Sequence, residues 1–224
     1  CRTLAGWERQ RTGSIRPPRL SVNLAAAQLA QPDIVDMLRS ALAEHGVDPE
    51  RLGVEVTESA VMTDVDRAIA ALEDLRRLGV HISIDDFGTG YSSLSYLKRF
   101  PAHELKLDRS FVSGIDRDPR DSSIVTAVVS LCHATGLSLV VEGVETENQR
   151  RLLHRLGCTT GQGFLWSPPL DQDELDRWLD SRGQLAVVSL PPPGQALVPL
   201  TSPRGGHGDG AGAAHPYAGG DRPE

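Results

Sequence analysis

Strand-like and helix-like segments alternate along most of this chain, and this alternation restricts its fold more than any other feature. Short runs rich in β-branched residues predict strands, and longer segments with apolar residues three and four positions apart predict amphipathic helices. Such an alternation is typical of a parallel sheet, in which a helix carries the chain back to the start of the next strand. We expect strands over residues 20–24, 52–57, 80–85, 104–107, 138–142 and 158–165.

The helical segments carry their own start and stop signals. Thr63 is expected to be the N-cap of the helix that follows it, and Thr146 is expected to form a capping box with Gln149. Ile124 has the helical spacing of a residue that faces the core. The predicted helices cover residues 1–11, 32–45, 64–78, 94–99, 121–135, 146–156 and 171–182.

Polar residues stand at or just beyond the end of every predicted strand. In a (β/α)8 barrel the functional side chains occupy this position, because the carboxyl ends of all strands meet at one rim. Six strand–helix units can be counted here, whereas eight close such a barrel. We therefore expect a TIM-type barrel that is incomplete at the amino end, with the absent strands preceding Cys1.

Composition separates the barrel from the end of the chain. Residues 183–224 are rich in Gly and Pro and contain almost no large apolar residue after Leu200. A segment of this composition cannot bury enough apolar surface to offset the entropy of ordering it. We expect one domain over residues 1–182 and a disordered tail over residues 183–224.

Charge, cysteine content and hydropathy exclude several classes of protein. The net charge of −7 argues against a DNA or RNA surface held by bulk electrostatics. Three widely spaced cysteines form neither a disulfide framework nor a zinc-binding pattern. The sequence has no secretory signal and no apolar run of membrane-spanning length, so we expect a cytoplasmic protein without membrane contact.

The adjacent carboxylates Asp85 and Asp86 follow a strand that is expected to be buried. Side chains alternate between the faces of a strand, so both can serve one centre only if the strand ends there. Two hard oxygen ligands beside a glycine-rich loop suggest a divalent metal. For the pair alone, helix capping by one Asp and a salt bridge from the other is the stronger interpretation.

The strand-end segments taken together resemble the EAL family, the phosphodiesterases of cyclic di-GMP. The resemblance covers about residues 20 to 180, and its most specific part is the loop from Asp85 to Ser93. The matching segments fall in the order of the family: SVNL from residue 21, EVTES from 55, DDFGTGYSS from 85, LKLD from 105, EGVE from 142 and QGF from 162.

The resemblance implies a barrel with a two-metal site for Mg²⁺ or Mn²⁺, and hydrolysis of cyclic di-GMP to linear pGpG. It assigns metal ligation to Asn23, Glu55, Asp85 and Asp86. Catalytic roles fall to Lys106, which holds the attacking water, to Glu142, and to Glu58, which braces the loop. Substrate binding or support falls to Gln162, Asp108 and Glu145. A homodimer formed through the side of the barrel near this loop is also plausible for the family.

Alternatives remain open at this point. No Glu-Ala-Leu sequence occurs in the chain, so a catalytically inactive module that binds cyclic di-GMP or partner proteins is the second hypothesis. A Schiff-base lyase using Lys106 is a third, disfavoured because a nucleophilic lysine needs a lowered pKa and this one is expected among carboxylates. Each strand-end residue alone also fits a cap, a turn or a salt bridge, and only the set favours function.

Overall fold

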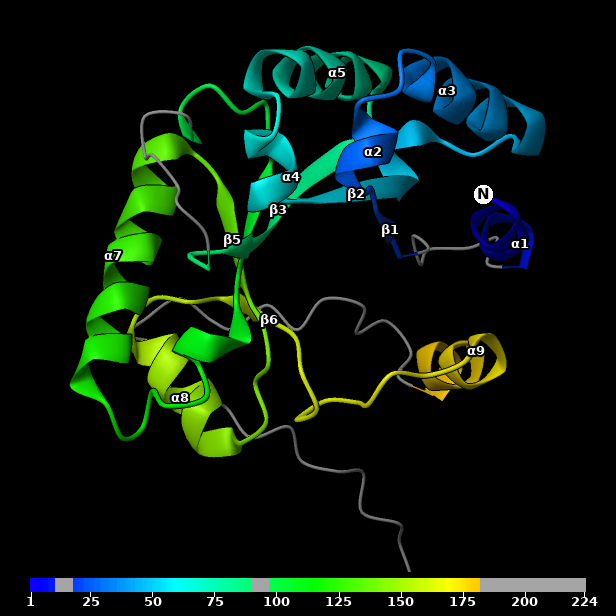
Figure 1. Ribbon diagram of the computed structural model, residues 1–224. Coiled ribbons are helices and arrows are strands. Elements are labelled where there is room, and N and C mark those ends of the chain that lie inside the picture. Colours follow the sequence, from blue (N-terminus) through cyan, green and yellow to red (C-terminus); the bar gives the residue numbers. More distant parts are fainter. Residues whose placement is uncertain (11–17, 90–96, 182–224) are drawn as a thin grey trace, which may run out of the picture.

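Parallel strands form one sheet whose order in space is the order along the chain (Figure 1). The computed structural model describes residues 1–10, 18–89 and 97–181. Within these residues the sheet has six strands, each parallel to its neighbours, which confirms the predicted parallel, partial-barrel architecture. The strands are β1 (Leu20–Asn23), β2 (Leu52–Thr57), β3 (His81–Phe87), β4 (Glu104–Leu107), β5 (Ser138–Val141) and β6 (Thr160–Gly161).

Helices cover the outer side of the curved sheet, with α3 and α5 over its first strands and α7 and α8 beside its later ones (Figure 1). Among the helices of the described residues, none is both long and apolar enough to cross a membrane. The helices are α1 (Arg2–Gln10), α2 (Ala26–Leu29), α3 (Ile34–His45), α4 (Glu58–Met62), α5 (Val65–Leu78), α7 (Pro119–Thr135), α8 (Glu147–Arg155) and α9 (Gln172–Ser181), with the short 3₁₀ helices η1 (Pro49–Arg51) and η2 (Arg109–Phe111).

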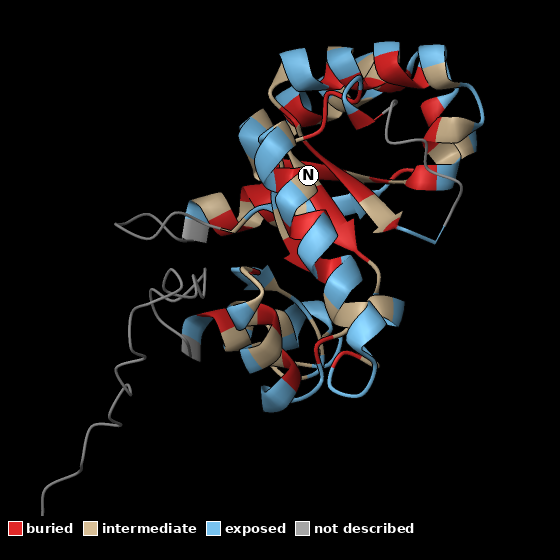
Figure 2. Cartoon of the chain, turned by 90° about the vertical axis from the view of Figure 1, so that its left-hand side faces the viewer, coloured by how far each residue is buried: buried red, intermediate tan, exposed pale blue. Residues whose placement is uncertain are grey.

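The two faces of the sheet have opposite character because side chains alternate along each strand. The face toward the helices is apolar in β2, β3 and β4, whose residues are mostly buried, and Figure 2 shows much of the sheet in the colour of buried residues. The other face carries polar side chains, which lie inside the curve of the sheet. The residues of the apolar face, each 0% exposed, are Val54, Val56, Ile82, Ile84, Leu105 and Leu107.

The first and last described helices are joined by a hydrogen bond. The indole Nε1 of Trp7, in α1, donates to Asp176 Oδ1, in α9, at 2.6 Å. Trp7 is 3% exposed, so its indole N–H needs a partner within the protein. This contact makes α9 part of the same folded unit as α1.

The helix over residues 64–78 begins differently from our expectation. Its N-cap is Asp64, whose Oδ1 accepts from the backbone N–H of Arg67, and not Thr63. The unpredicted helix α4 takes up Thr63 at its end, where the hydroxyl donates to the carbonyl of Ser59. The capping box of Thr146 and Gln149 at the start of α8 is confirmed.

Two further expectations were wrong in part. Ile124 is 38% exposed, because the apolar residues of α7 spread around the helix instead of forming one stripe. The strand expected over 158–165 is reduced to Thr160–Gly161, since the chain then turns at Gly163, whose φ is +153°. The first half of the short helix expected over residues 94–99, and the tail over 183–224, lie outside the described residues.

Candidate metal and phosphodiesterase site

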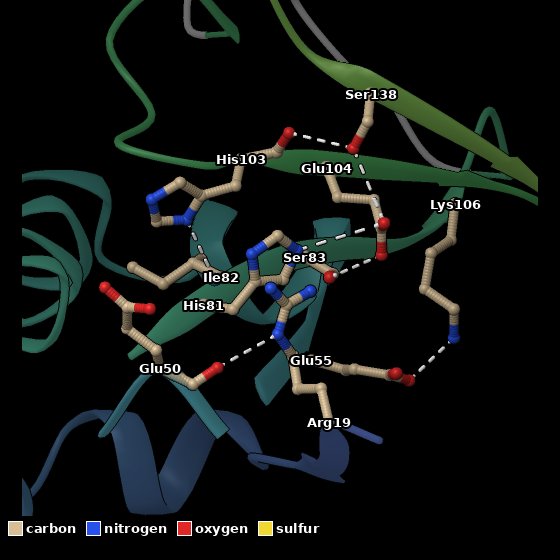
Figure 3. Close-up of polar contacts among 10 residues, drawn as sticks. All are labelled: Arg19, Glu50, Glu55, His81, Ile82, Ser83, His103, Glu104, Lys106 and Ser138. Carbon is tan, nitrogen blue, oxygen red and sulfur yellow. Dashed lines mark hydrogen bonds and ion pairs between the residues drawn. The ribbon is translucent and has the colours of Figure 1, made fainter. Parts of the chain in front are cut away.

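A buried lysine surrounded by carboxylates lies on the polar face of the sheet. The ammonium group of Lys106 is 2.6 Å from Glu55 Oε2, 2.7 Å from Glu142 Oε1 and 3.1 Å from Asp85 Oδ1. Lys106 is only 5% exposed, and its pair with Glu55 is drawn in Figure 3. Carboxylates from three segments of the chain therefore converge on one cation.

Strand register explains this convergence. Asn23 at the end of β1 lies opposite Glu55 of β2, and Thr57 of β2 lies opposite Asp85 of β3. Glu142 follows β5 directly, and its backbone N–H donates to the carbonyl of Leu107 in β4. Because all strands are parallel, their carboxyl ends meet at the same edge of the sheet. The side chains of Glu55, Asp85, Lys106 and Glu142 therefore lie together at this edge.

Asp85 and Asp86 reach the same centre through a backbone irregularity and not through the end of the strand. The strand β3 continues to Phe87, and its register with β4 shifts between Ile84 and Phe87. Asp86 has a φ of +54°, the left-handed conformation that Asp and Asn adopt more readily than most residues. The bulge turns both side chains to one side, and one oxygen each of Asp85, Asp86 and Glu142 lies within 4.8 Å of the others.

The charge state of Lys106 is set by its neighbours. Burial alone would lower the pKa of Lys106, but the hydrogen bonds and charges of Glu142 and Glu55 outweigh burial. They hold the pKa of Lys106 well above that of an ordinary lysine. The side chain therefore stays an ammonium ion at neutral pH, which is the form that donates hydrogen bonds and cannot act as a nucleophile.

Two of the carboxylates are destabilised as anions. Burial raises the pKa of Glu142, and the charges of Asp85 and Glu55 raise it further against the opposing effect of Lys106. Burial likewise raises the pKa of Asp86, with added repulsion from Asp85 and Asp108. These carboxylates outnumber the single cation among them, so an additional positive charge would lower the energy of the cluster.

Gln162 contacts a member of the cluster directly. Its amide Nε2 donates to Glu142 Oε1 at 2.8 Å, the same oxygen that pairs with Lys106. Two donors on one oxygen fix the orientation of the Glu142 carboxylate. We interpret Gln162 as a residue that positions Glu142, in addition to the substrate contact expected from the sequence.

A Gln162→Leu variant tests this positioning role. We expect Mn²⁺ affinity to fall about 10-fold to 100-fold, because the side chain of Glu142 loses one of the two donors that hold it. Mn²⁺ titration of the purified chain measures this change. Gln31→Leu, at an exposed position, serves as the matched control. Unchanged Mn²⁺ affinity together with weaker nucleotide binding would instead support a pure substrate contact.

Glu58 lies beside the cluster and holds the loop after β3. It is 2% exposed, and its Oε2 accepts from the backbone N–H of Gly88 at 3.2 Å. The other oxygen of this carboxylate has no hydrogen-bond partner among the described residues. The contact with Gly88 is consistent with the bracing role expected for Glu58, although residues 90–93 of the loop lie outside the described part of the chain.

Asp108 and Glu145 make no direct contact with the cluster among the described residues. Asp108 caps η2, accepting from the backbone N–H of Ser110 at 2.9 Å. Burial raises the pKa of Asp108, but the hydrogen bonds from Ser110 and Arg109, with the charge of Arg109, outweigh burial and lower it overall. Glu145 is exposed on the turn before α8, where its backbone N–H donates to Gln149 Oε1. Their expected roles stay predictions.

Sequence reasoning missed a polar layer beneath the cluster, toward the amino ends of the strands (Figure 3). Ser83, which is 0% exposed, donates to Glu104 Oε1 at 2.9 Å, and His81 Nε2 lies 3.9 Å from Glu104 Oε2. Polar residues at every second position of β3, His81, Ser83 and Asp85, were the available signal. They show that the inner face of this strand is polar from its start at His81 to Asp85.

Comparison with known proteins places this geometry in context. The family model described as "EAL domain" matches residues 1–169. The bifunctional diguanylate cyclase/cyclic di-GMP phosphodiesterase MucR of Pseudomonas aeruginosa is 51% identical over 156 residues, which are 70% of this chain and 23% of that protein. The chain spans about a quarter of the length of the curated relatives it matches first.

Solved structures share the fold. The cyclic di-GMP complex of the PaMucR phosphodiesterase superposes with a TM-score of 0.73 at 47% identity, covering 78% of this chain and 70% of that one. A manganese and cyclic di-GMP complex of Klebsiella pneumoniae BlrP1 gives a TM-score of 0.66 at 36% identity, covering 75% of this chain and 42% of that one. The chain is therefore similar to these two solved structures both in fold and in sequence.

Proposed function

Because the chain belongs to the EAL domain family, we propose that it hydrolyses cyclic di-GMP to linear pGpG with Mg²⁺ or Mn²⁺ as cofactor. The observation that carries this proposal is the gathering of four carboxylates around Lys106 at the carboxyl edge of a parallel sheet. The carboxylates belong to Glu55, Asp85, Asp86 and Glu142. A phosphodiester substrate is the class of ligand that such a site suits once divalent cations offset its negative charge.

The residues present fit a divalent metal. Their donors are carboxylate oxygens, which Mg²⁺ and Mn²⁺ prefer over the nitrogen and sulfur donors of zinc sites. Asn23, whose Cα is paired with that of Glu55 in the strand register, would add a neutral oxygen. We propose that Asn23, Glu55 and Asp85 hold one ion and that Asp86 holds a second. When bound, such ions neutralise charge on a phosphoryl group and make water a stronger nucleophile.

We assign catalytic roles to the side chains of Lys106 and Glu142, in addition to those of the metal ions. A permanently protonated Lys106 Nζ donates hydrogen bonds, so it orients the attacking water and offsets charge that develops on the phosphoryl oxygens. Its raised pKa argues against the Schiff-base alternative, which requires a neutral amine. Glu142 Oε1 is engaged by Lys106 and Gln162, so we assign contact with metal or water to its other oxygen. Asp108, Glu145 and Gln162 are proposed to support or bind the substrate.

A binding module is the second candidate function. The sequence contains no Glu-Ala-Leu, which supplies a metal ligand in the family that the chain resembles. A site of this kind can bind a nucleotide through its charged and polar groups without completing the reaction. This candidate predicts binding of cyclic di-GMP without product.

The deciding experiment is turnover of cyclic di-GMP by this chain, followed by chromatography, with Mn²⁺, with Mg²⁺ and with EDTA. Hydrolysis would be supported if pGpG forms only with metal and does not form in a Lys106→Met variant. Nucleotide binding in calorimetry with Mn²⁺, without pGpG after long incubation, would support the binding module. If the chain showed no turnover and no nucleotide binding, both candidates would be rejected.

Three broader expectations accompany this proposal. We place the domain boundary at residue 182, because α9 is tied to α1 by the bond between Trp7 and Asp176. We place the protein in the cytoplasm, where cyclic di-GMP acts as a second messenger. A homodimer is proposed by family resemblance, and sedimentation of the purified chain tests it directly.

A further inference from the structure

A histidine side chain completes the hydrogen-bond ladder between β3 and β4. The backbone N–H of Ile82 donates to the ring nitrogen Nδ1 of His103 at 3.1 Å. The backbone N–H of His103 donates back to the carbonyl of Ile82 at 2.9 Å. His103 is thus hydrogen-bonded to both the backbone N–H and the carbonyl of Ile82, immediately before β4 begins at Glu104 (Figure 3).

This contact specifies the protonation state of the imidazole. The N–H of Ile82 is a donor, so Nδ1 must offer a lone pair, and the ring is neutral with its proton on Nε2. A protonated imidazole carries N–H groups on both nitrogens, so its Nδ1–H would face the backbone N–H of Ile82 and no hydrogen bond could form. Because Ile82 is 0% exposed, its N–H could not turn to water for another partner.

We propose that neutral His103 is a positioning residue that locks the start of β4 to β3, and that protonation of its imidazole releases this lock. The lock lies close to the candidate site on both strands. Asp85 is the third residue after Ile82, and Lys106 is the third residue after His103. The regular register of these strands, Ser83 with Glu104 and Ile84 with Leu105, starts at the lock and breaks at the bulge.

His103 also holds the next strand. Its carbonyl oxygen accepts from the backbone N–H of Ser138 at 3.0 Å and from the hydroxyl of Ser138 at 3.1 Å. Ser138 is the first residue of β5, so His103 joins the starts of three neighbouring strands. The backbone contacts do not depend on protonation, whereas the contact between Nδ1 and Ile82 does. Protonation therefore weakens the junction at one defined bond.

The surroundings of His103 favour the neutral ring. His81 stacks on it with ring centroids 4.8 Å apart and an angle of 17° between the planes. Burial lowers the pKa of His103, and the charges of His81, Arg76 and Arg19 lower it further, whereas Glu104 opposes them. The charged and titratable groups that act on it come from four segments: His81 of β3, Arg76 of α5, Arg19 before β1 and Glu104 of β4. Figure 3 shows His81, Arg19 and Glu104 together with His103.

The direction of the pH effect follows from this lowered pKa. Above the usual histidine pKa of 6.5, the ring is neutral in both the folded and the unfolded chain, and the lock contributes fully. As the pH falls below this value, the unfolded chain binds a proton before the folded chain does, so stability is lost. The loss continues until the pH passes the folded pKa of His103.

Three substitutions separate the lock from simple packing. His103→Asn places an amide oxygen near the position of Nδ1, and this oxygen accepts a hydrogen bond at any pH. His103→Gln places its amide near the position of Nε2 instead, and His103→Leu has no acceptor. Urea unfolding between about pH 8 and about pH 5, and NMR exchange of the Ile82 amide in the full 224-residue chain, measure the effects.

We expect His103→Asn to keep slow exchange at Ile82 and to lose less stability on acidification than the unsubstituted chain. In His103→Gln and His103→Leu, exchange at Ile82 should be roughly tenfold to a hundredfold faster at about pH 8. Equal pH dependence of the Asn variant and the unsubstituted chain would overturn the proposal. If His103→Leu does not fold, the ring ¹⁵N shifts of His103 decide alone, because a proton on Nδ1 at neutral pH contradicts the lock.

Discussion

A Lys106→Met variant is expected to lose about 3–5 kcal/mol of stability in metal-free buffer, the largest stability effect of a single substitution that we anticipate. Methionine fills a similar volume but carries no charge, so buried carboxylates lose the cation that compensates them. The three carboxylates in contact with Lys106 are those of Glu55, Asp85 and Glu142. Urea unfolding in the presence of EDTA measures the change in the free energy of unfolding.

Divalent metal should reverse the stability defect of Lys106→Met without restoring its activity. At about a hundredfold excess over its dissociation constant, Mn²⁺ should return about 2–3 kcal/mol, because the ion takes over the missing positive charge. Turnover should remain at least about a hundredfold lower, since the donor at the reacting phosphoryl group is absent. Activity equal to that of the unsubstituted chain would exclude the proposed role of Lys106.

The chain offers a matched control in its other lysine. Lys98 is exposed, and Lys98→Met should change stability by no more than about 0.5 kcal/mol. If the two lysine variants were equally stable without metal, the ion pairs of Lys106 would not contribute the stability that their geometry implies. The comparison therefore tests the cluster separately from the identity of the substrate.

The fold and the convergence of the site were predictable because they depend on short-range patterns. Period-two alternation identified β2 and β4 at their observed bounds, Leu52–Thr57 and Glu104–Leu107. Parallel strands bring their carboxyl ends to one edge, so Glu55, Asp85 and Lys106 had to be neighbours once the sheet formed. Their contacts follow from topology, and the sequence specifies that topology by its order of strands and helices.

Features that depend on a single backbone angle or on distant partners were not predictable. Strict alternation would place Asp85 and Asp86 on opposite faces, and only the left-handed conformation of Asp86 brings them together. Nothing near Ile82 in the sequence marks His103 as its hydrogen-bond partner, since 21 residues separate them. The helix α4 escaped notice because its five residues are too few to show a periodic pattern.

An Asp86→Asn variant is expected to separate stability from metal binding most cleanly. In metal-free buffer it should be more stable by no more than about 0.5 kcal/mol, because burial and Asp85 disfavour the Asp86 anion and raise its pKa, while solvent screens most of this effect at a partly exposed side chain. Asparagine adopts the left-handed conformation readily, so the bulge should persist. With Mn²⁺, turnover should fall at least about a hundredfold, because a proposed ligand of the second ion has lost its charge.

The stability difference between Asp86→Asn and the unsubstituted chain should depend on pH. Since folding raises the pKa of Asp86, the folded chain keeps the proton longer, and ionisation costs stability as the pH rises through that pKa. The advantage of Asp86→Asn should thus be absent below about pH 4 and complete near neutrality.

Asp33→Asn, at an exposed position without a side-chain cap, should show neither the gain in stability nor the loss of turnover. Mn²⁺ that stabilised Asp86→Asn as strongly as the unsubstituted chain would remove Asp86 from the set of metal ligands, leaving Asn23, Glu55 and Asp85 to hold a single ion.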